Sequence, residues 1–217
     1  MKTVLVIGIG MFGKHLAKRM AELGNEVMVI DKNEERVNEM LPYVTRAQIG
    51  DCMDIKVLQS LGVNNFDICF VCIGDNFQAS LEITSQLKEL GAKYVVSKAD
   101  REIQEKFLLR NGADEAIHPE RDVALRAARK YSIQNVFEYF ELSGDFSLFE
   151  IAVPSGWEGR SVKDVNVRLR YNINIVAYGP KGNLMPFTNA EHIFEKGEHL
   201  MIAGKASDCE KLVRLSK

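Results

Sequence analysis

The sequence predicts an α/β protein in which a doubly wound parallel sheet is followed by a small α+β domain. Three observations lead to this fold class. Strand-like apolar runs alternate with amphipathic helical segments through about residue 120, a glycine-rich turn joins the first run to the first helix, and the chain becomes strand-rich from about Ser147. The 217 residues, 46% of them apolar, are enough for two domains with buried cores.

The first part of the chain predicts six strands and five helices in strict alternation. Apolar runs predict strands at Thr3–Ile9, Glu26–Ile30, Ala47–Ile49, Asp67–Ile73, Lys93–Ser97 and Asp114–Ile117. Helical spacing predicts helices at Phe12–Leu23, Asn33–Leu41, Asp54–Leu61, Asn76–Leu90 and Arg101–Asn111, several of which end at a glycine. Because right-handed crossovers join such units, the sheet should be parallel and covered on both faces.

The second part of the chain predicts a different architecture. We expect a helix at Arg121–Tyr131, followed by the apolar and aromatic segment 132–142, which either packs on the chain's own sheet or forms a dimerisation or hinge element. The sequence Gly179–Asn183 predicts a hairpin turn. The expected boundaries are therefore 1–120 for a nucleotide-binding domain, 121–143 for crossover and dimerisation helices, and 144–217 for the C-terminal domain.

Charge and composition exclude several classes of protein. The formal net charge is −2, with acidic and basic residues interspersed, which argues against a nucleic-acid-binding protein. No apolar run is long enough to cross a membrane. Cys69 and Cys72 form a C-x-x-C pair, but they lie three residues apart in a predicted strand and should face opposite sides of it. We therefore expect buried free thiols, as in a reducing cytoplasm, and no redox or zinc site.

Gly8, Gly10 and Gly13 form a G-x-G-x-x-G motif where the first predicted strand meets the first helix. In this context the motif indicates a Rossmann-type nucleotide site. Gly8 permits the tight turn, Gly10 lets the backbone approach a pyrophosphate, and Gly13 lets the helix pack closely on the strand. The helix N-terminus offers unpaired N–H groups to the phosphates.

Polar residues follow the next strands at their carboxyl ends, where open α/β sheets bind ligands. Asp31 ends the second predicted strand, where a carboxylate accepts hydrogen bonds from ribose hydroxyls and should repel a 2′-phosphate. This favours AMP-type or NAD-type ligands over NADP. Residues 50–52 follow the third strand and are expected near the adenine. Residues 73–76 follow the fourth strand and are expected near the ribose or phosphates.

The search for catalytic groups favours a protein that is not an enzyme. Tyr94 and Lys98 match the Tyr-x-x-x-Lys pair of short-chain dehydrogenases in letters only. That pair needs a helix, in which four residues rise about 6 Å, whereas four residues of a strand span about 13 Å. Neither His15, His192 nor His199 has the pattern of an acid–base catalyst. An NAD-linked oxidoreductase is the first alternative, and a soluble nucleotide sensor without a membrane partner is the second.

Several of these motifs together resemble the RCK family, the cytosolic regulators of Trk and Ktr potassium uptake. The resemblance is carried by the glycine motif with its flanking strand and helix, by Gly50–Asp51, by residues 73–76, by residues 117–120, and by the C-terminal segment 161–178. It covers nearly the whole chain. It implies a nucleotide-binding gating subunit that assembles as dimers into an octameric ring on the inner face of the cell membrane, below a membrane-embedded potassium transporter subunit.

The resemblance also implies ligands and further site residues. Family members bind ATP, ADP or NAD(H), and we expect an adenine nucleotide (AMP, ADP or ATP) or NAD(H) as the ligand here. Glu120 matches a glutamate that holds a divalent cation, Mg²⁺ or Ca²⁺, although it can equally be a helix-capping acid, and Lys98 matches a basic position near the ligand. The motifs and the resemblance together predict one set of nucleotide-binding residues: Gly8, Ile9, Gly10, Met11, Phe12, Gly13, Asp31, Lys32, Asp51, Cys52, Ile73, Gly74, Asp75, Asn76, Lys98 and Glu120.

One position departs from the family pattern. Ktr-type members commonly carry an arginine after the second glycine of the motif, and here that residue is Met11. Because a methionine cannot pair with a γ-phosphate, the resemblance implies a mono- or diphosphate or NAD(H) more than a strict ATP preference. In the C-terminal domain, Arg168 and Asn174 match residue types that some relatives use to bind cyclic di-AMP.

Overall fold

The computed structural model describes residues 1–132 and 135–215, which form two compact units. These are Met1–Arg121, here called the N-terminal unit, and Asp122–Lys217, here called the C-terminal unit. Residues 133–134, in the expected crossover segment, and 216–217, in the expected C-terminal domain, lie outside the described residues. Each unit has its own sheet and its own hydrophobic core.

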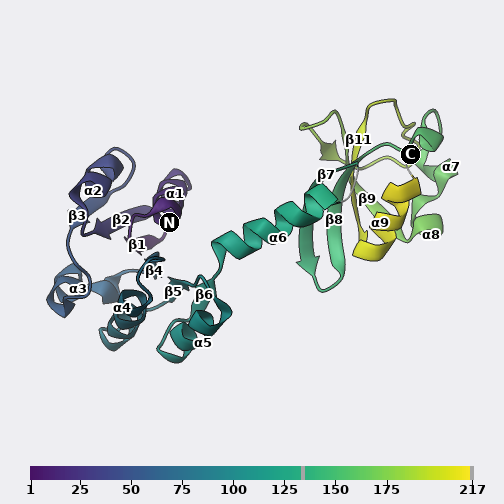
Figure 1. The fold of residues 1–217 in the computed structure, drawn as a ribbon. Coiled ribbons are helices and arrows are strands. Elements are labelled where there is room, and N and C mark those ends of the chain that lie inside the picture. Colours follow the sequence, from purple (N-terminus) through teal and green to yellow (C-terminus); the bar gives the residue numbers. More distant parts are fainter. Residues whose placement is uncertain (133–134, 216–217) are drawn as a thin grey trace. The chain divides into compact units, whose positions relative to one another are not determined.

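The N-terminal unit contains a six-stranded sheet in the order β3-β2-β1-β4-β5-β6 (Figure 1). All five neighbouring pairs are parallel. The strands are β1 (Thr3–Ile7), β2 (Glu26–Asp31), β3 (Arg46–Ile49), β4 (Ile68–Val71), β5 (Val95–Lys98) and β6 (Glu115–Ile117). The order reverses between β1 and β4, so the predicted doubly wound sheet is confirmed, with its ligand-binding crevice expected at that reversal.

Helices cover both faces of this sheet, as the continuous apolar strands predict. They are α1 (Met11–Glu22), α2 (Glu34–Met40), α3 (Ile55–Leu61), α4 (Phe77–Glu89) and α5 (Glu102–Arg110), with a short 3₁₀ turn at Val63–Asn65. Alternate β1 residues serve different cores: Val4 and Val6 pack with residues of α1 and α2, and Leu5 and Ile7 pack with residues of α3 and α4. Figure 1 shows α1 and α2 on one side of the sheet and α3, α4 and α5 on the other.

The two cysteines of the C-x-x-C pair belong to different cores, as their spacing in a strand predicts. Cys69 packs in the core beneath α3 and α4, and Cys72 in the core beneath α1 and α2. Both are free and buried, and burial raises the pKa of each thiol to about 12. The thiols are therefore protonated at neutral pH, and the prediction that the two cysteines are buried on opposite faces of the strand is confirmed.

The C-terminal unit is built on an antiparallel sheet of five strands in the order β10-β9-β11-β8-β7. The strands are β7 (Val136–Ser143), β8 (Phe146–Ala152), β9 (Ile173–Gly179), β10 (Met185–Pro186) and β11 (His199–Lys205). Helix α6 (Pro119–Ser132) begins at the end of the N-terminal unit and continues into the C-terminal unit, whose other helices are α7 (Val162–Val165), α8 (Val167–Tyr171) and α9 (Ala206–Leu215), with a 3₁₀ turn at Ser155–Trp157. The predicted hairpin turn at Gly179–Asn183 joins β9 to β10.

The expectation of helices throughout 121–143 was wrong for its second half. The chain is helical in α6, but residues 136–143 form strand β7, which pairs antiparallel with β8 across a turn at Gly144. Pairing with β8 supplies the backbone hydrogen bonds of this segment and buries Val136 and Tyr139, and aromatic and β-branched residues favour a strand. Residues 136–142 of this segment therefore pack on the chain's own sheet, as one of its two interpretations predicts.

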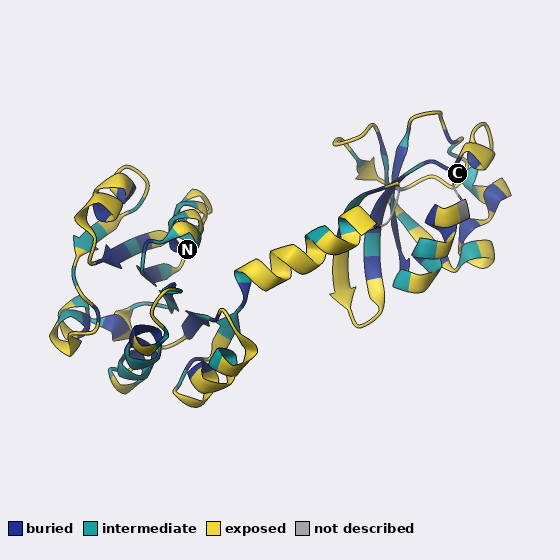
Figure 2. Ribbon diagram, viewed as in Figure 1, coloured by how far each residue is buried: buried dark blue, intermediate teal, exposed yellow. Residues whose placement is uncertain are grey.

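Helix α6 is exposed along its length, and none of its described residues is buried (Figure 2). Val123, Leu125 and Tyr131 are all exposed apolar side chains. Its last turn is attached to β7 through polar contacts, with Arg129 donating to the hydroxyl of Tyr139 and Lys130 pairing with Glu138 at 2.5 Å. The dimerisation role of this segment stays a prediction.

Candidate functional site

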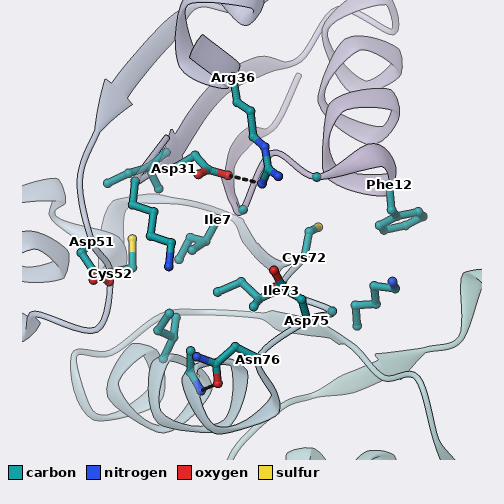
Figure 3. A pocket seen from close by; sticks show the side chains of 18 of the residues that line it. Ile7, Phe12, Asp31, Arg36, Asp51, Cys52, Cys72, Ile73, Asp75 and Asn76 are labelled. Atoms are coloured by element: carbon teal, nitrogen blue, oxygen red, sulfur yellow. Dashed lines mark hydrogen bonds and ion pairs between the residues drawn. The ribbon is translucent and has the colours of Figure 1, made fainter. Parts of the chain in front are cut away.

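A cavity of about 530 Å³ lies in the N-terminal unit, where the carboxyl ends of the strands meet (Figure 3). Its walls come from the glycine turn after β1, from the segments that follow β2, β3 and β4, from the end of β5 and from the first turn of α6. The lining residues are Ile7, Gly8, Gly10, Met11, Phe12, Ile30, Asp31, Lys32, Arg36, Gly50, Asp51, Cys52, Met53, Cys72, Ile73, Gly74, Asp75, Asn76, Ala79, Ile83, Lys98 and Glu120.

The glycine turn has the geometry that the motif predicts. Gly8 has a φ of +89°, which favours glycine, and its N–H donates to Ile30 O at 2.9 Å. A Cβ on Gly13 would lie 2.1 Å from Gly8 O, so helix and turn approach too closely for any side chain there. A Cβ on Gly10 would meet nothing within 4 Å. The requirement for glycine at Gly13 is therefore internal packing, whereas Gly10 faces open space in the cavity.

The N-terminus of α1 opens into this space without a side-chain cap. Gly10 is the N-cap residue, no acidic residue lies in the first turn, and the helix is 12 residues long. The first N–H groups of the helix are thus without a carboxylate partner, and the helix dipole adds partial positive charge. Met11 is 78% exposed beside them. This corner of the cavity can accept an anionic group through backbone donors.

Asp31 is buried and is held by backbone amides. Its Oδ2 accepts from Ile9 N–H at 2.6 Å, and its Oδ1 accepts from Asn33 N–H at 2.9 Å. Arg36, on α2, places Nη1 3.8 Å from Asp31 Oδ2, and Figure 3 shows its side chain reaching toward Asp31 at the cavity. The carboxylate therefore fixes the glycine turn and the start of α2, and each oxygen keeps a further lone pair for a ligand. We call this region, with Asp51 and Met53, the Asp31 end.

The opposite wall of the cavity contains a different arrangement, here called the Lys98 end. Lys98 Nζ lies 2.8 Å from Glu120 Oε1 and 3.2 Å from Asp100 Oδ1. The lysine side chain is only 12% exposed, while that of Glu120 is 66% exposed. A Cβ on Gly74 would lie 2.9 Å from Lys98 Nζ, so glycine at this position leaves room for the ammonium group.

The ion pairs set the charge state of the Lys98 end. Burial by itself would lower the pKa of Lys98, but hydrogen bonds to Glu120 and Asp100 outweigh it and the pKa lies above its usual value. The hydrogen bond from Lys98 lowers the pKa of Glu120. Both groups are consequently charged at neutral pH, and this end of the cavity carries a cation whose partners are side chains and can be exchanged.

Nearly all predicted nucleotide-binding residues line this one cavity. The exceptions are Ile9 and Gly13. The side chain of Ile9 is buried in the core beneath α1 and α2, and its contribution to the site is the N–H bond to Asp31. Gly13 is buried against Gly8. The topology explains this result, because parallel strands bring all their carboxyl ends to one edge of the sheet.

Arg36 and Met53 are lining residues that the sequence analysis missed. Arg36 lies in the first turn of the helix that follows Asp31, and Met53 follows Asp51 and Cys52 after β3. The available indication was position: the first turn of a helix after a parallel strand lies at the same edge as the strand end. Side-chain direction toward the cavity is decided by the fold and is not visible in the spacing.

Tyr94 and Lys98 have different partners, and each of the two histidines in the C-terminal unit pairs with a glutamate. The hydroxyl of Tyr94 donates to Glu115, whereas Lys98 pairs with Glu120 and Asp100. In the C-terminal unit, His199 Nδ1 lies 2.8 Å from Glu150 and His192 Nε2 lies 2.9 Å from Glu198. Over residues 1–132 and 135–215 the structure has no group of three or more His, Cys, Asp or Glu side chains that could hold a metal ion.

Arg168 and Asn174, the residues expected to bind a ligand in the C-terminal domain, lie close together. Arg168 Nε donates to Asn174 Oδ1 at 2.8 Å on an exposed surface, so these two predicted residues are neighbours. The cyclic di-AMP role suggested for them stays a prediction. No helix in the described part of the chain has the length and apolar character needed to span a membrane.

Comparison with known proteins places the whole chain in one group. A TrkA-N domain matches residues 4–119, and a TrkA-C domain matches residues 147–217. The chain is 40% identical over 210 residues to the Ktr system potassium uptake protein C of Bacillus subtilis (strain 168), covering 97% of this chain and 95% of that protein. It is 36% identical over 210 residues to the Ktr system potassium uptake protein A of the same organism, with the same coverage.

A solved structure shares the fold. The GsuK channel bound to NAD matches 100% of this chain with a TM-score of 0.68 and 16% sequence identity. The chain spans about two fifths of that channel chain, 39% of its length. The similarity covers both units, so the Rossmann-type sheet and the small antiparallel domain occur together in that protein as well.

Proposed function

The chain belongs to the Ktr and Trk family of potassium uptake proteins with TrkA-N and TrkA-C domains, and from this membership we propose that it is a nucleotide-binding regulatory subunit of a potassium uptake system. The observation that carries the proposal is identity of 40% with a Ktr protein over nearly the full length of both chains. The cavity supplies the regulatory site, and the proposal assigns the chain no catalytic step.

The cavity fits an adenine nucleotide (AMP, ADP or ATP) or NAD(H). Gly10 leaves open space beside the free N–H groups of α1, which suits a phosphate, and the remaining lone pairs of Asp31 suit ribose hydroxyls. The similar GsuK channel structure contains NAD. Met11 is exposed and uncharged, so it cannot pair with a γ-phosphate. We therefore propose a ligand of which the site binds one or two phosphates.

The coupling to the rest of the chain passes through the Lys98 end. A phosphate entering the cavity competes with Glu120 for Lys98, since both acceptors are anionic and the ammonium group is nearly buried. Glu120 lies in the first turn of α6, the helix that leads into the C-terminal unit. When a phosphate replaces Glu120 at Lys98, the ion pair that holds the start of α6 is lost. The nucleotide then shifts the equilibrium between two conformations of the protein by the difference in its affinity for them, typically about 1–3 kcal/mol.

The proposed partners are further copies or relatives of this chain and a membrane-embedded potassium transporter subunit. The expected assembly is dimers within an octameric ring on the inner face of the cell membrane. Glu120 supplies a single carboxylate, and the described residues make no metal site by themselves. A divalent cation at Glu120 therefore needs ligands from the nucleotide or from another chain.

The first test is binding. Calorimetric titration with AMP, ADP, ATP and NADH, with and without Mg²⁺, should give selective binding by a multimeric protein. Gly10→Ala should lose that binding at an unchanged melting temperature, because its Cβ would occupy open cavity space. A protein that binds none of the four ligands is not the proposed regulator. Turnover of NADH with a small carbonyl compound would point to the oxidoreductase alternative.

The second test is regulation. Rubidium uptake would be measured in proteoliposomes that contain the cognate membrane transporter subunit, with the chain added alone or with the tightest nucleotide. Uptake should change with nucleotide for the wild-type chain and not for Gly10→Ala. If the chain binds nucleotide but neither copurifies with the transporter nor changes uptake, it is a soluble nucleotide sensor, the remaining alternative.

A further inference from the structure

The ribose edge of the cavity contains a cation that the sequence analysis did not identify. Asp31 by itself predicts that a 2′-phosphate is repelled. In the structure, Arg36 Nη1 lies 3.8 Å from Asp31 Oδ2 and lines the same cavity, as does Lys32. Two cations therefore accompany the carboxylate at the place where a ribose 2′-oxygen would be recognised.

The backbone fixes where Arg36 stands. Asn33 N–H donates to Asp31 Oδ1, and the Asn33 side chain in turn accepts from Arg36 N–H at 3.0 Å as the N-cap of α2. The two bonds tie the Cα of Arg36 to the position of Asp31. Only the side chain of Arg36 can change direction. Because its Cα is held near Asp31, the side chain leaves the backbone next to the ribose edge in every rotamer.

The contact between Arg36 and Asp31 is weak enough to be exchanged. The separation is 3.8 Å, and the arginine side chain is 53% exposed, which is typical of an ion pair that contributes little to stability. Asp31 does not depend on it, because amides of Ile9 and Asn33 already bond to both carboxylate oxygens. The guanidinium can leave Asp31 without exposing an unsatisfied buried charge.

We propose that Arg36 is a specificity-determining residue that pairs with a phosphate on the ribose 2′-oxygen, so that the site accepts 2′-phosphorylated dinucleotides that Asp31 alone would reject. This inference rests on the proposed nucleotide-binding function and names a ligand class for it. A guanidinium presents a planar pair of donors to a phosphate and binds it in a bidentate manner, which a hydroxyl cannot match. Lys32 adds charge on a flexible stem but no such geometry.

The test compares two ligands that differ only in the 2′-phosphate. Calorimetric titration of the full chain with NADH and NADPH should give dissociation constants within about tenfold of each other, because attraction by Arg36 offsets repulsion by Asp31. Arg36→Gln should weaken NADPH binding about tenfold or more while changing NADH binding by about twofold or less. Lys32→Gln is the matched control and should change the NADPH to NADH ratio by less than Arg36→Gln.

The outcomes separate this inference from the proposed function. Wild-type protein that binds NADH but rejects NADPH overturns the role of Arg36 and leaves the nucleotide site standing. Equal losses for both ligands in Arg36→Gln also overturn it, because Arg36 would then act on the shared part of the ligand. A wild-type chain that binds no adenine nucleotide at all refutes the proposed function itself. Melting temperatures of the three proteins, expected to agree closely, exclude misfolding as the cause of a loss.

Discussion

The two ends of the cavity in the N-terminal unit are built from different kinds of interaction. At the Asp31 end a buried carboxylate is held by backbone amides of Ile9 and Asn33, beside a glycine turn that tolerates no side chain at Gly13. At the Lys98 end an ammonium group is held by two side-chain carboxylates, one of them largely exposed. The first arrangement is part of the fold, and the second can exchange partners.

The difference assigns separate tasks to the two ends. An adenosine is common to all the proposed ligands, and it is expected at the rigid Asp31 end. The number of phosphates varies among these ligands, and we expect the phosphates to extend toward the Lys98 end, where Lys98 can exchange a carboxylate partner for a phosphate. Substitution of Asp31 or of Gly13 in the glycine turn should therefore lower stability, whereas substitutions at the Lys98 end should change affinity and leave stability nearly unaltered.

The largest expected effect is that of Gly13→Ala. Its Cβ would lie 2.1 Å from Gly8 O, so α1 must move away from the turn, at a cost of about 3 kcal/mol or more. Chemical denaturation followed by circular dichroism measures this loss. Gly10→Ala, one helical turn earlier, has no atom within 4 Å of its Cβ and should keep wild-type stability. Equal stability of the two variants would contradict the packing of α1 on the glycine turn.

A smaller loss is expected for Asp31→Ala, which leaves the amides of Ile9 and Asn33 without their acceptor. An unsatisfied buried donor costs about 1–3 kcal/mol, so the N-terminal unit should unfold at lower denaturant concentration. Lys98→Met is the matched substitution at the other end and should stay within about 1 kcal/mol of the wild type.

The chain offers an internal control for the stability measurements. Its single tryptophan, Trp157, is 4% exposed in the core of the C-terminal unit. Tryptophan fluorescence should therefore follow the C-terminal unit, and its transition should be unaffected by Gly13→Ala or Asp31→Ala if the units unfold independently. A loss of stability in Lys98→Met as large as that in Asp31→Ala would remove the distinction between the two ends.

At the Lys98 end, Glu120→Gln should change affinity. The substitution removes the anion that competes with phosphate for Lys98, so ADP should bind about three- to tenfold more tightly in the presence of a chelator. Calorimetry measures the change, and Glu115→Gln, on β6 with its carboxylate at Tyr94, is a control that should leave affinity unaltered. Weaker binding of ADP by Glu120→Gln without metal would show that Glu120 does not compete with the ligand.

The smallest expected effect is the pH dependence of that gain. The pKa of Glu120 is lowered from 4.5 and that of Lys98 is raised from 10.5, so the pair stays charged between these values. As pH falls below 4.5, Glu120 gains a proton and the pair is lost; as pH rises above 10.5, Lys98 loses its proton. The affinity ratio of Glu120→Gln to wild type should thus be constant from pH 6 to 8.5, since titration of ADP itself cancels in the ratio. A ratio that changes within this range would mean that another group controls the competition.

The sequence by itself determined the N-terminal unit and most of the site. The six strands and five helices were found because apolar periodicity and helix caps are local, and Asn33, where the second helix was expected to begin, accepts a hydrogen bond from Arg36 N–H. The parallel topology then brings every strand end to one edge, which is why residues from six separate segments could be assigned to a single cavity. The glycine motif and Asp31 needed no distant partner to be recognised.

Only the tertiary structure decided the features that depend on such partners. Residues 136–143 form a strand because β8 is available to pair with them, and their own sequence is compatible with either state. The amides that bond Asp31, the approach of Arg36 and the pairing of Lys98 with Glu120 join residues through the fold, where side-chain direction and neighbouring strands determine contact. Sequence periodicity specifies which face a residue occupies, but the packing of separate elements specifies which group it meets there.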